Sequence, residues 1–320
     1  MDQNARIFVA GHRGLVGSAL VRGLKRRGYT GVYGRTRAEL DLRDRVAVRD
    51  FFSAQVPDVV LLAAARVGGI LANSTYPADF IRENLEIELN VIEEARQHGV
   101  RRLLFLGSSC IYPRDCPQPI REDYLLTGPL EVTNRPYALA KLAGVEMCHA
   151  YNRQYGTRFL AVMPTNLYGL NDNYDLVGAH VIPALIRKFH EAKLSNSPRA
   201  VIWGTGRPRR EFLFGDDLAD ACIFLLECPE DNLAPLFLED RPPLVNIGCG
   251  QDVSISELAE SISELVGFRG MLVYDESKPD GTPQKVLDIS LLSELGWRAR
   301  TGLSDGLKLV YRDFLEGYRT

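Results

Sequence analysis

Gly11-His12-Arg13-Gly14-Leu15-Val16-Gly17 is the stretch that decides the fold. It follows the apolar run at residues 6–10, which predicts a strand, and it opens the run at residues 15–27, which predicts a helix. Glycine permits a tight turn there and lets the backbone approach a pyrophosphate, which the free amides and dipole of the helix N-terminus attract. A strand, a glycine turn and a helix in this order predict the first βαβ unit of a dinucleotide-binding sheet.

The rest of the first half repeats this alternation of short apolar runs and helical patterns. We expect further strands at residues 31–34, 58–65, 102–107 and 159–163, and helices at residues 43–55, 78–98 and 134–155. Residues 58–65 are apolar almost throughout, as a strand covered on both faces requires. The sequence therefore predicts an α/β fold with a Rossmann-type doubly wound parallel sheet.

The composition excludes several classes of protein. The 320 residues are 46% hydrophobic and 25% charged, with a formal net charge of -3, so nothing indicates nucleic-acid or membrane binding by charge. The first 12 residues lack the features of a signal peptide, and the longest apolar run, at residues 59–65, is too short to span a bilayer. The cysteines show neither C-x-x-C pairs nor zinc-ligand spacing, so we expect reduced thiols, no metal and a cytoplasmic protein. They are Cys110, Cys116, Cys148, Cys222, Cys228 and Cys249.

The end of the second expected strand discriminates between the two nicotinamide cofactors. An acidic residue there suits the ribose 2′-hydroxyl, whereas a basic residue suits a 2′-phosphate. This chain has Gly34-Arg35-Thr36-Arg37 and no carboxylate before Glu39, and Arg13 is placed to reach the same phosphate. Arg35 and Arg37 could instead be solvated surface charges. Three arginines near one expected phosphate favour NADP(H).

The pattern loosens beyond residue 168. A polar loop at residues 171–178 precedes a helix at 181–191, a strand at 199–203, a strand-to-helix unit at 211–228 and a strand at 244–247. A helix from Ser254, a strand at 271–274 and a loop at 277–282 follow. We expect an NADP-binding domain made of residues 1–168 and 211–248, and a smaller α/β substrate-binding domain made of residues 169–210 and 249–320.

Tyr137 and Lys141 form a candidate catalytic pair. Their spacing of four places both side chains on one face of a helix, and an ammonium beside a phenol lowers the pKa of the phenol. The alternative is a surface lysine beside a partly buried tyrosine. Ser108 follows the expected strand at 102–107, where its hydroxyl could hydrogen-bond a substrate carbonyl. These three residues predict proton transfer to or from a carbonyl oxygen.

The glycine turn, Ser108 and Tyr137-x-x-x-Lys141 together resemble the extended short-chain dehydrogenase/reductase superfamily, and more closely the GDP-L-fucose synthase family within it. The resemblance covers nearly the whole chain, with Arg66 at a position where lysine is expected. It rests on the glycine turn and on Ala63-Ala64-Ala65-Arg66-Val67-Gly68-Gly69, Ser108-Ser109-Cys110-Ile111-Tyr112-Pro113, Met163-Pro164-Thr165-Asn166-Leu167-Tyr168-Gly169, His180-Val181-Ile182-Pro183-Ala184, Arg210-Glu211-Phe212 and Lys278-Pro279-Asp280-Gly281-Thr282-Pro283.

The resemblance implies an NADPH-dependent 3,5-epimerisation and 4-keto reduction of GDP-4-keto-6-deoxy-D-mannose to GDP-L-fucose. It implies Cys110 as the base and His180 as the acid of the epimerisation, and Ser108, Tyr137 and Lys141 as the residues of the reduction. From the residues alone, Cys110 could be an inert packing cysteine and His180 an ordinary residue at a helix start. What activates the Cys110 thiol stays open.

The resemblance also implies the binding residues and a homodimer formed through the helices at 78–98 and 134–155. Which of Arg207, Arg209 and Arg210 meets the diphosphate stays open. The implied cofactor-binding residues are Gly11, His12, Arg13, Gly14, Leu15, Val16, Gly17, Arg35, Arg37, Leu106, Gly107, Lys141, Pro164, Thr165, Asn166, Leu167 and His180. The implied substrate-binding residues are Asn166, Lys188, Trp203, Arg210 and Asp280.

Two other readings compete. Another nucleotide-sugar 4-epimerase, reductase or 4,6-dehydratase would share the fold, but a dehydratase is expected to carry carboxylates where Ser109-Cys110 stands. A 4-epimerase that holds oxidised NAD would favour an acid after the second strand, and none is present there. A non-catalytic NADP-binding sensor is the reading from a different class, and it would not need Ser108, Tyr137 and Lys141 together.

Overall fold

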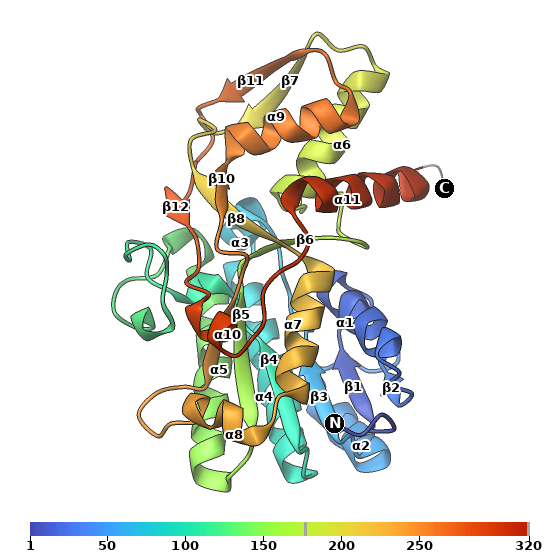
Figure 1. Cartoon of the computed structure of the whole chain (residues 1–320), viewed down its shortest axis with the longest axis vertical. Helices are drawn as coiled ribbons and strands as arrows, with labels where there is room; N and C mark the ends of the chain where they lie inside the picture. The colour runs from blue at the N-terminus through green and yellow to red at the C-terminus, as the bar shows by residue number, and fades with distance from the viewer. Residues whose placement is uncertain (176–177, 319–320) are drawn as a thin grey trace.

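A six-stranded parallel sheet forms the lower part of the protein in the computed structural model, which describes residues 1–175 and 178–318 (Figure 1). Its strand order is β2-β1-β3-β4-β5-β9, so the chain reverses direction across the sheet between β1 and β3. The strands are β1 (Ile7–Ala10), β2 (Val32–Tyr33), β3 (Val59–Leu62), β4 (Arg102–Leu106), β5 (Phe159–Pro164) and β9 (Leu244–Ile247). This is the predicted doubly wound sheet, and such a reversal point is where these sheets bind ligands.

Two helical layers cover the sheet because its side chains alternate between two cores. Ile7 and Val9 of β1 face one core, and Phe8 and Ala10 face the other. The first layer consists of α1 (Leu15–Arg26) and α7 (Gly215–Glu227), and the second of α2 (Arg45–Gln55), α4 (Pro77–Gln97) and α5 (Arg135–Tyr155). All four residues of β1 and all four of β3 are buried, which explains the uninterrupted apolar runs in the sequence.

A smaller α/β part stands above the carboxyl ends of these strands (Figure 1). It has its own core, in which Phe189, Phe212, Ile262 and Phe314 are buried. It consists of α6 (Val181–Leu194), β7 (Arg199–Trp203), α9 (Ile255–Val266), β11 (Met271–Asp275) and α11 (Leu303–Tyr318), with β7 and β11 pairing in parallel.

A four-stranded sheet joins the two parts. Its central strand is β8 (Arg209–Phe214), which pairs with β6 (Asn166–Tyr168), β10 (Asp252–Ser254) and β12 (Gln284–Lys285). Phe212 and Phe214 of β8 pack in the upper core, while Leu213 between them packs in the core of the main sheet. One strand therefore belongs to both cores, because its side chains alternate in direction.

The shorter elements connect these layers. They are α3 (Ile70–Thr75), α8 (Glu230–Leu233) and α10 (Ser290–Glu294), and the single 3-10 turns at Ser109–Ile111, Glu122–Tyr124, Val132–Asn134 and Ala234–Leu236. The predicted main sheet and its helices are confirmed within a few residues. The sequence interpretation missed the helices α3, α8, α10 and α11 and the strands β6, β10 and β12. Apart from α11, each of these has six residues or fewer, which is too short for a periodic pattern to show.

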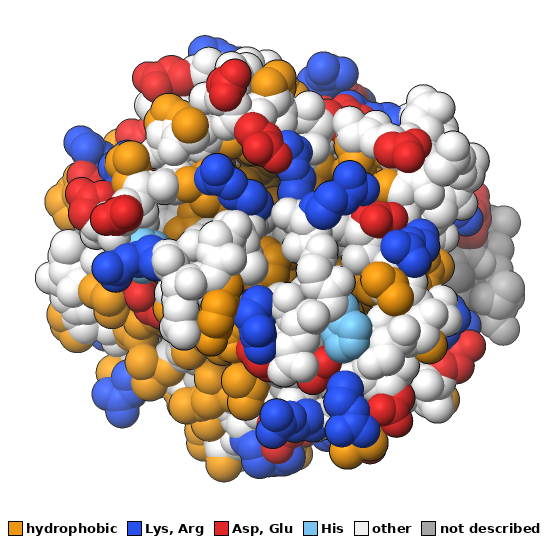
Figure 2. All heavy atoms as spheres, turned by 90° about the horizontal axis from the view of Figure 1, so that it is seen from below, with side chains coloured by type: hydrophobic (Ala, Val, Ile, Leu, Met, Phe, Trp, Pro, Cys, Tyr) orange, Lys and Arg blue, Asp and Glu red, His pale blue; other side chains and the backbone are white. Residues whose placement is uncertain are grey.

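Seen from the end at which the strands of the main sheet begin (Figure 2), acidic and basic side chains are interspersed, with apolar ones between them. None of the described helices combines the length and the apolar character that a bilayer span requires. In residues 1–175 and 178–318, no three His, Cys, Asp or Glu side chains are grouped so that they could hold a metal ion.

Candidate active site

The turn after β1 has the shape that a dinucleotide pyrophosphate requires. Gly11 has φ +85°, and a Cβ atom there would lie 2.8 Å from the backbone nitrogen of Ala64. A Cβ atom on Gly17 would lie 2.1 Å from the carbonyl oxygen of Gly11. Gly14 precedes α1 and supplies no side-chain cap, so no side chain at this position occupies the first amides of the helix. The residues therefore fit an anion at the start of α1.

The two predicted arginines at the end of β2 lie in different environments. Arg35 donates a hydrogen bond to the carbonyl oxygen of Gly34 at 3.0 Å, and its guanidinium lies 5.7 Å from the ring centre of Phe51. Arg37 is exposed and lies 3.8 Å from the carboxylate of Asp41. Arg35 is therefore held against the fold, whereas Arg37 is a weakly held surface charge.

Glu39 marks the place where Arg13 and Arg35 approach each other. Its carboxylate accepts hydrogen bonds from the backbone and hydroxyl groups of Thr36 at 2.7 and 2.8 Å. These bonds lower the pKa of Glu39, and the charges of Arg35 and Arg13 lower it further. Both arginines thus lie near the loop that follows β2, where a 2′-phosphate would have to bind, and the Glu39 carboxylate would compete with it for their charges.

The carboxyl ends of β4 and β5 supply the next group of predicted cofactor contacts. Leu106 ends β4 and Pro164 ends β5, in neighbouring parallel strands. A Cβ atom on Gly107 would lie 1.9 Å from the end of the Met163 side chain, so a larger residue at this position would displace that side chain. The predicted contacts at Thr165, Asn166 and Leu167 follow directly, and the structure brings these backbone segments to one edge of the sheet.

Ser108, Cys110 and Tyr137 meet just beyond this edge. Ser108 begins the turn Ser109–Ile111, and its hydroxyl accepts a hydrogen bond from the backbone nitrogen of Cys110 at 3.4 Å. Tyr137 lies in the first turn of α5, close enough to Ser108 and Cys110 that both influence the pKa of its phenol. Burial raises the pKa of Tyr137 well above its usual value, and the nearby Cys110 and Glu88 raise it further. The phenol therefore keeps its proton in this site.

Lys141 lies one turn further along α5 and is buried, with a relative exposure of 2%. Its ammonium donates to the carbonyl oxygen of Leu106 at 3.0 Å and lies 3.2 Å from the carboxylate of Glu88. It is also 6.0 Å from the ring centre of Tyr137. In this structure the ammonium is engaged by Leu106 and Glu88, and burial is the dominant influence on the pKa of the Tyr137 phenol.

The sequence analysis did not identify Glu88 as a functional residue, although its position on the helix indicates one. It lies on the buried face of α4, four residues after the buried Asn84 and three before the buried Val91, where an apolar residue is expected. Its relative exposure is 1%. Burial raises the pKa of Glu88 to about 7, and the charge of Lys141 opposes this rise. A buried carboxylate beside a buried lysine is the sign that could have pointed to this pair.

His180 immediately precedes α6. The preceding residue, Ala179, lies beside Gly69, since a Cβ atom on Gly69 would be 3.6 Å from the Ala179 carbonyl oxygen. His180 is exposed at the surface of the structure, although the surrounding protein still lowers the pKa of its ring. In the described part of the chain the ring makes no hydrogen bond with Cys110 or Tyr137, so the structure does not itself join His180 to them.

Trp203, at the end of β7, presents an indole between two lysines. Its relative exposure is 53%, and the ammonium groups of Lys188 and Lys278 lie 5.7 and 5.5 Å from its ring centre. Lys188 also donates to the carbonyl oxygen of Val201 at 2.7 Å. The predicted substrate-binding residues Lys188 and Trp203 thus lie together in the structure. Lys278 lies beside them, although it was not predicted as a binding residue. An open aromatic face flanked by cations suits a nucleotide or its phosphates.

Arg209 and Arg210, at the start of β8, differ in how their charges are paired. Arg209 donates to the carboxylate of Asp252 at 2.9 Å, so its charge is already paired. Arg210 bonds only to backbone carbonyl oxygens, including that of Asp280 at 3.4 Å. The Asp280 carboxylate accepts from the backbone and hydroxyl of Thr205, both at 2.7 Å. Arg210 is therefore the arginine of this pair with a charge left for a ligand.

Asn166 links the main sheet to this group. Its side-chain amide donates to the carbonyl oxygen of Glu211 at 2.8 Å, and the hydroxyl of Thr165 donates to the same oxygen at 3.3 Å. The end of β5 is thereby tied to β8, next to Arg210. The two parts of the molecule consequently contribute to one site above the carboxyl ends of the sheet strands.

The sequence pattern of the NAD dependent epimerase/dehydratase family matches residues 7–248, from β1 to the end of β9. The chain belongs to this family. The match spans the glycine turn, Ser108, Tyr137 and Lys141, which are the features on which the prediction of this superfamily depends.

Closer relatives within the family cover almost the whole chain. GDP-L-fucose synthase 1 of Arabidopsis thaliana is 55% identical over 98% of this chain and 94% of its own length. GDP-L-fucose synthase of Escherichia coli is 52% identical, with 97% of each chain covered. A solved GDP-mannoheptose C4 reductase of Campylobacter jejuni with NADP bound is 39% identical, covers 98% of this chain and 99% of that one, and has a TM-score of 0.90.

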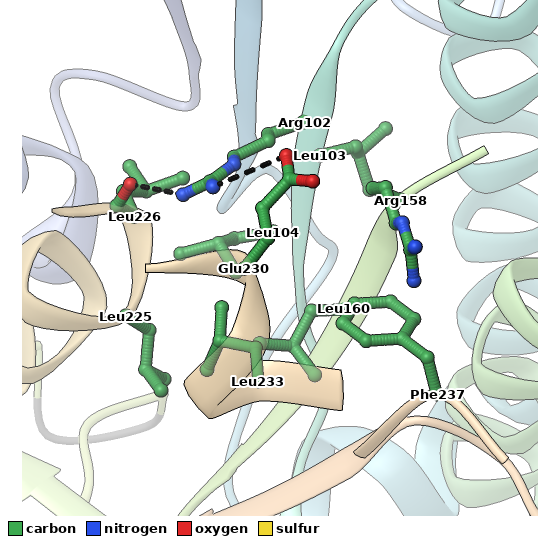
Figure 3. A pocket seen from close by; sticks show the side chains of 10 residues that line it. All are labelled: Arg102, Leu103, Leu104, Arg158, Leu160, Leu225, Leu226, Glu230, Leu233 and Phe237. Atoms are coloured by element: carbon green, nitrogen blue, oxygen red, sulfur yellow. Dashed lines mark hydrogen bonds and ion pairs between the residues drawn. The ribbon is translucent and has the colours of Figure 1, made fainter. Parts of the chain in front are cut away.

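A second hollow lies at the opposite end of the main sheet and lacks the chemistry of this family (Figure 3). Mostly leucine side chains line it, around Leu104, Leu160 and Leu233. Arg102 at its edge is paired with Glu230 at 3.5 Å, and Arg158 lies over Phe237. Because β4 begins at Arg102 and ends at Leu106, this hollow and the Ser108 site lie at opposite ends of the same strand.

Proposed function

We propose that the protein carries out the NADPH-dependent 3,5-epimerisation and 4-keto reduction of GDP-4-keto-6-deoxy-D-mannose to GDP-L-fucose. The single observation that carries the proposal is the meeting of Ser108, Cys110 and Tyr137 beside the buried Lys141. This set offers both a carbonyl-directed acid and a thiol base. The relatives named GDP-L-fucose synthase, which match nearly end to end, support the same assignment.

The residues around the glycine turn would hold the cofactor. The amides at the start of α1 suit the pyrophosphate, and Arg13 and Arg35 suit the 2′-phosphate that distinguishes NADP(H). Lys141 and the backbone around Gly107 and Pro164 would complete the trough. When bound, NADPH supplies the hydride that reduces a carbonyl carbon.

Tyr137 is the proton donor of the reduction in this proposal. Its phenol is kept protonated by burial, so it can donate to the oxygen of the reduced keto group. Ser108, whose hydroxyl lies near Tyr137, holds that oxygen within reach. Lys141 is fixed through Leu106 and Glu88, and from there it supports the charge that develops near the phenol.

Cys110 and His180 carry the epimerisation. The 4-keto group makes the neighbouring C–H bonds acidic, and Cys110 removes the proton from one face. His180 returns a proton to the opposite face. Ser108 and Tyr137 stabilise the enolate oxygen between the two steps.

The upper part would bind the GDP-sugar. Lys188 of α6 lies with Trp203 at the end of β7, and Arg210 of β8 lies with Asp280 in the loop before β12. Asn166 contributes from the main sheet. We therefore propose that residues 1–168 and 211–248 form the NADP-binding domain, and residues 169–210 and 249–320 the substrate-binding domain.

A homodimer formed through α4 and α5 is part of the proposal. The two helices pack together and carry the exposed Leu85, Leu89 and Leu139, and Leu89 has a relative exposure of 53%. Exposed leucines on adjacent helices suit an apolar interface. Six unpaired cysteines support a reducing, cytoplasmic setting.

The test uses purified protein, GDP-4-keto-6-deoxy-D-mannose and NADPH. We expect NADPH absorbance to fall only with the sugar present, NADH to work less well, and the product to have the fucose configuration. Tyr137→Phe should reduce turnover by about 100-fold or more, because it removes the proton donor. The Campylobacter jejuni relative raises the alternative of a C4 reductase without epimerisation, which would give no deuterium at carbons 3 and 5 in heavy water.

A further inference from the structure

Lys285 lies next to Cys110 although the two are far apart in sequence. Both residues line one cavity between the Ser109–Ile111 turn and β12, together with Tyr112, Gln118 and Asn134. β12 pairs in parallel with β8, and this register places Lys285 opposite Arg210. The lysine therefore enters the site from the substrate-binding side.

The backbone around Lys285 is held from two sides. On one side, the buried carboxylate of Glu211 accepts a hydrogen bond from the backbone nitrogen of Leu287 at 2.9 Å. On the other side, the backbone nitrogen of Val286 donates to the side-chain oxygen of Gln118 at 2.9 Å, and Ile120 donates to the Val286 carbonyl oxygen at 2.8 Å. The position of Lys285 is thus built into the fold.

The charge of Lys285 has no partner within residues 1–175 and 178–318, where its ammonium forms neither a hydrogen bond nor an ion pair. Burial lowers the pKa of Lys285, and the neighbouring thiols of Cys110 and Cys116 oppose this effect while Arg210 adds to it. An unpaired cation held beside a thiol is costly unless an anion forms there. The thiolate of Cys110 is such an anion.

The groups that face Cys110 differ in what they can offer a thiolate. Burial raises the pKa of the Cys110 thiol; of the opposing influences the charge of Lys285 is the strongest, followed by the hydrogen bond with Ser108 and the charge of Lys141. Lys141 is already paired with Glu88 at 3.2 Å, and Tyr137 is a neutral phenol. Two lysine charges act on the Cys110 thiol, and of these only Lys285 forms no ion pair or hydrogen bond within the described residues. Arg114 and Glu131 also line the cavity, but they lie 3.4 Å apart and pair with each other.

We propose that Lys285 is a positioning residue that favours the thiolate of Cys110 during epimerisation. The proposal rests on the function proposed above. In each inversion the thiolate takes the proton from the carbon beside the ketone, and the C–H electron pair moves to the enolate oxygen. His180 then gives its proton to the opposite face of that carbon, and exchange with water restores the thiolate and the protonated histidine.

The test measures the thiolate of Cys110 directly. The ultraviolet thiolate absorbance is titrated against pH in the cofactor-free protein, and Cys110→Ser in the same background is subtracted to remove the other five cysteines. We expect Lys285→Met to move the Cys110 titration up by at least about one pH unit, which is a tenfold loss of thiolate below the midpoint. Lys285→Arg should restore most of the shift, and Lys308→Met on α11 should leave it unchanged.

Deuterium incorporation into the keto-sugar, without NADPH, is the second measurement. The rate should fall about tenfold in Lys285→Met at neutral pH and recover as the pH is raised.

If Lys285 only bound the diphosphate, the variant would raise KM while the titration overlapped that of the wild type, and the proposal would be wrong. A shifted titration in a wild-type protein that exchanges no deuterium would instead reject the proposed epimerisation and keep the Lys285 effect. If Lys285→Met does not fold, as judged by circular dichroism, Lys285→Gln serves as the neutral variant.

Discussion

Glu88 and Lys141 show how much a single buried pair can determine. Both side chains are almost fully buried, and the carboxylate lies 3.2 Å from the ammonium. The charge that Lys141 presents to Tyr137 therefore depends on a residue of another helix. Since a buried pair costs solvation on both sides, its net contribution to stability is small, and its value lies in fixing Lys141.

Glu88→Gln should change how stability depends on pH. Burial raises the pKa of Glu88 from 4.5 to about 7, so the folded protein binds a proton at pH values where the unfolded chain has released it. The stability from neutral Glu88 is therefore fully present below about pH 4.5 and is lost as the pH rises to about 7. The free energy of unfolding of the wild type, minus that of Glu88→Gln, should fall across this window. Urea unfolding at several pH values measures it, and parallel curves for the two proteins would contradict the assignment.

Gly17→Ala should weaken cofactor binding while the rest of the fold survives. The added Cβ atom would lie 2.1 Å from the carbonyl oxygen of Gly11, so the turn must open and lose its fit to a pyrophosphate. We expect the Kd for NADPH, from fluorescence titration, to rise at least about tenfold, which is about 1.4 kcal/mol. Gly302→Ala is the matched control, because its Cβ atom meets nothing within 4 Å. An unchanged Kd in Gly17→Ala would show that the cofactor binds elsewhere.

At the scale of elements, local signals and partner elements contribute differently. α2 begins where the side chain of Asp44 accepts hydrogen bonds from the amides of Val46 and Ala47 at 2.9 and 3.1 Å. This start is readable in the sequence, since aspartate is a preferred N-cap. β12 has only two residues and exists because β8 and the loop at Gln118 hold it. The strand that carries Lys285 therefore has no local signal of its own.

Asp44→Ala should destabilise the protein by about 1 kcal/mol, the usual cost of removing an N-cap. Activity per folded molecule should not change, because the hydrogen bonds of the Asp44 side chain go to the first amides of its own helix and not to the residues of the site. Asp50→Ala is the control: it removes an acid from the same helix, but Asp50 pairs only with the exposed Arg49. Urea unfolding at neutral pH compares the two. Equal losses in both variants would mean that charge, and not the cap, is responsible.

Two features act at the scale of the whole molecule. The alternating side chains of β8 pack in two cores, and the helices α4 and α5 leave leucine side chains exposed. The first feature couples the cofactor side of the site to the substrate side. The second leaves an apolar surface that a second copy of the chain would cover. Assembly is therefore the property that belongs to this scale.

Leu89→Glu should convert the proposed dimer into monomers. A carboxylate in an apolar interface would lose its hydration without a partner, while the same side chain on a free surface costs little. Sedimentation velocity at micromolar concentration should give a dimer for the wild type and a monomer for the variant. Leu309 on α11 is an exposed leucine outside the proposed interface, with a relative exposure of 40%. The control variant Leu309→Glu should therefore remain dimeric. A wild type that sediments as a monomer would reject the interface.

The sequence by itself determined the parallel sheet, the glycine turn and the pairing of Tyr137 with Lys141 on one helix. These depend on local properties, namely the conformations open to glycine, the apolar runs of buried strands and the four-residue spacing of a helix. Only the tertiary structure decided that Lys141 meets Glu88, that Arg209 is paired while Arg210 is free, and that Lys285 stands beside Cys110. These facts depend on contacts between distant segments, and the ionisation of a side chain is set by the burial and charges that such contacts create.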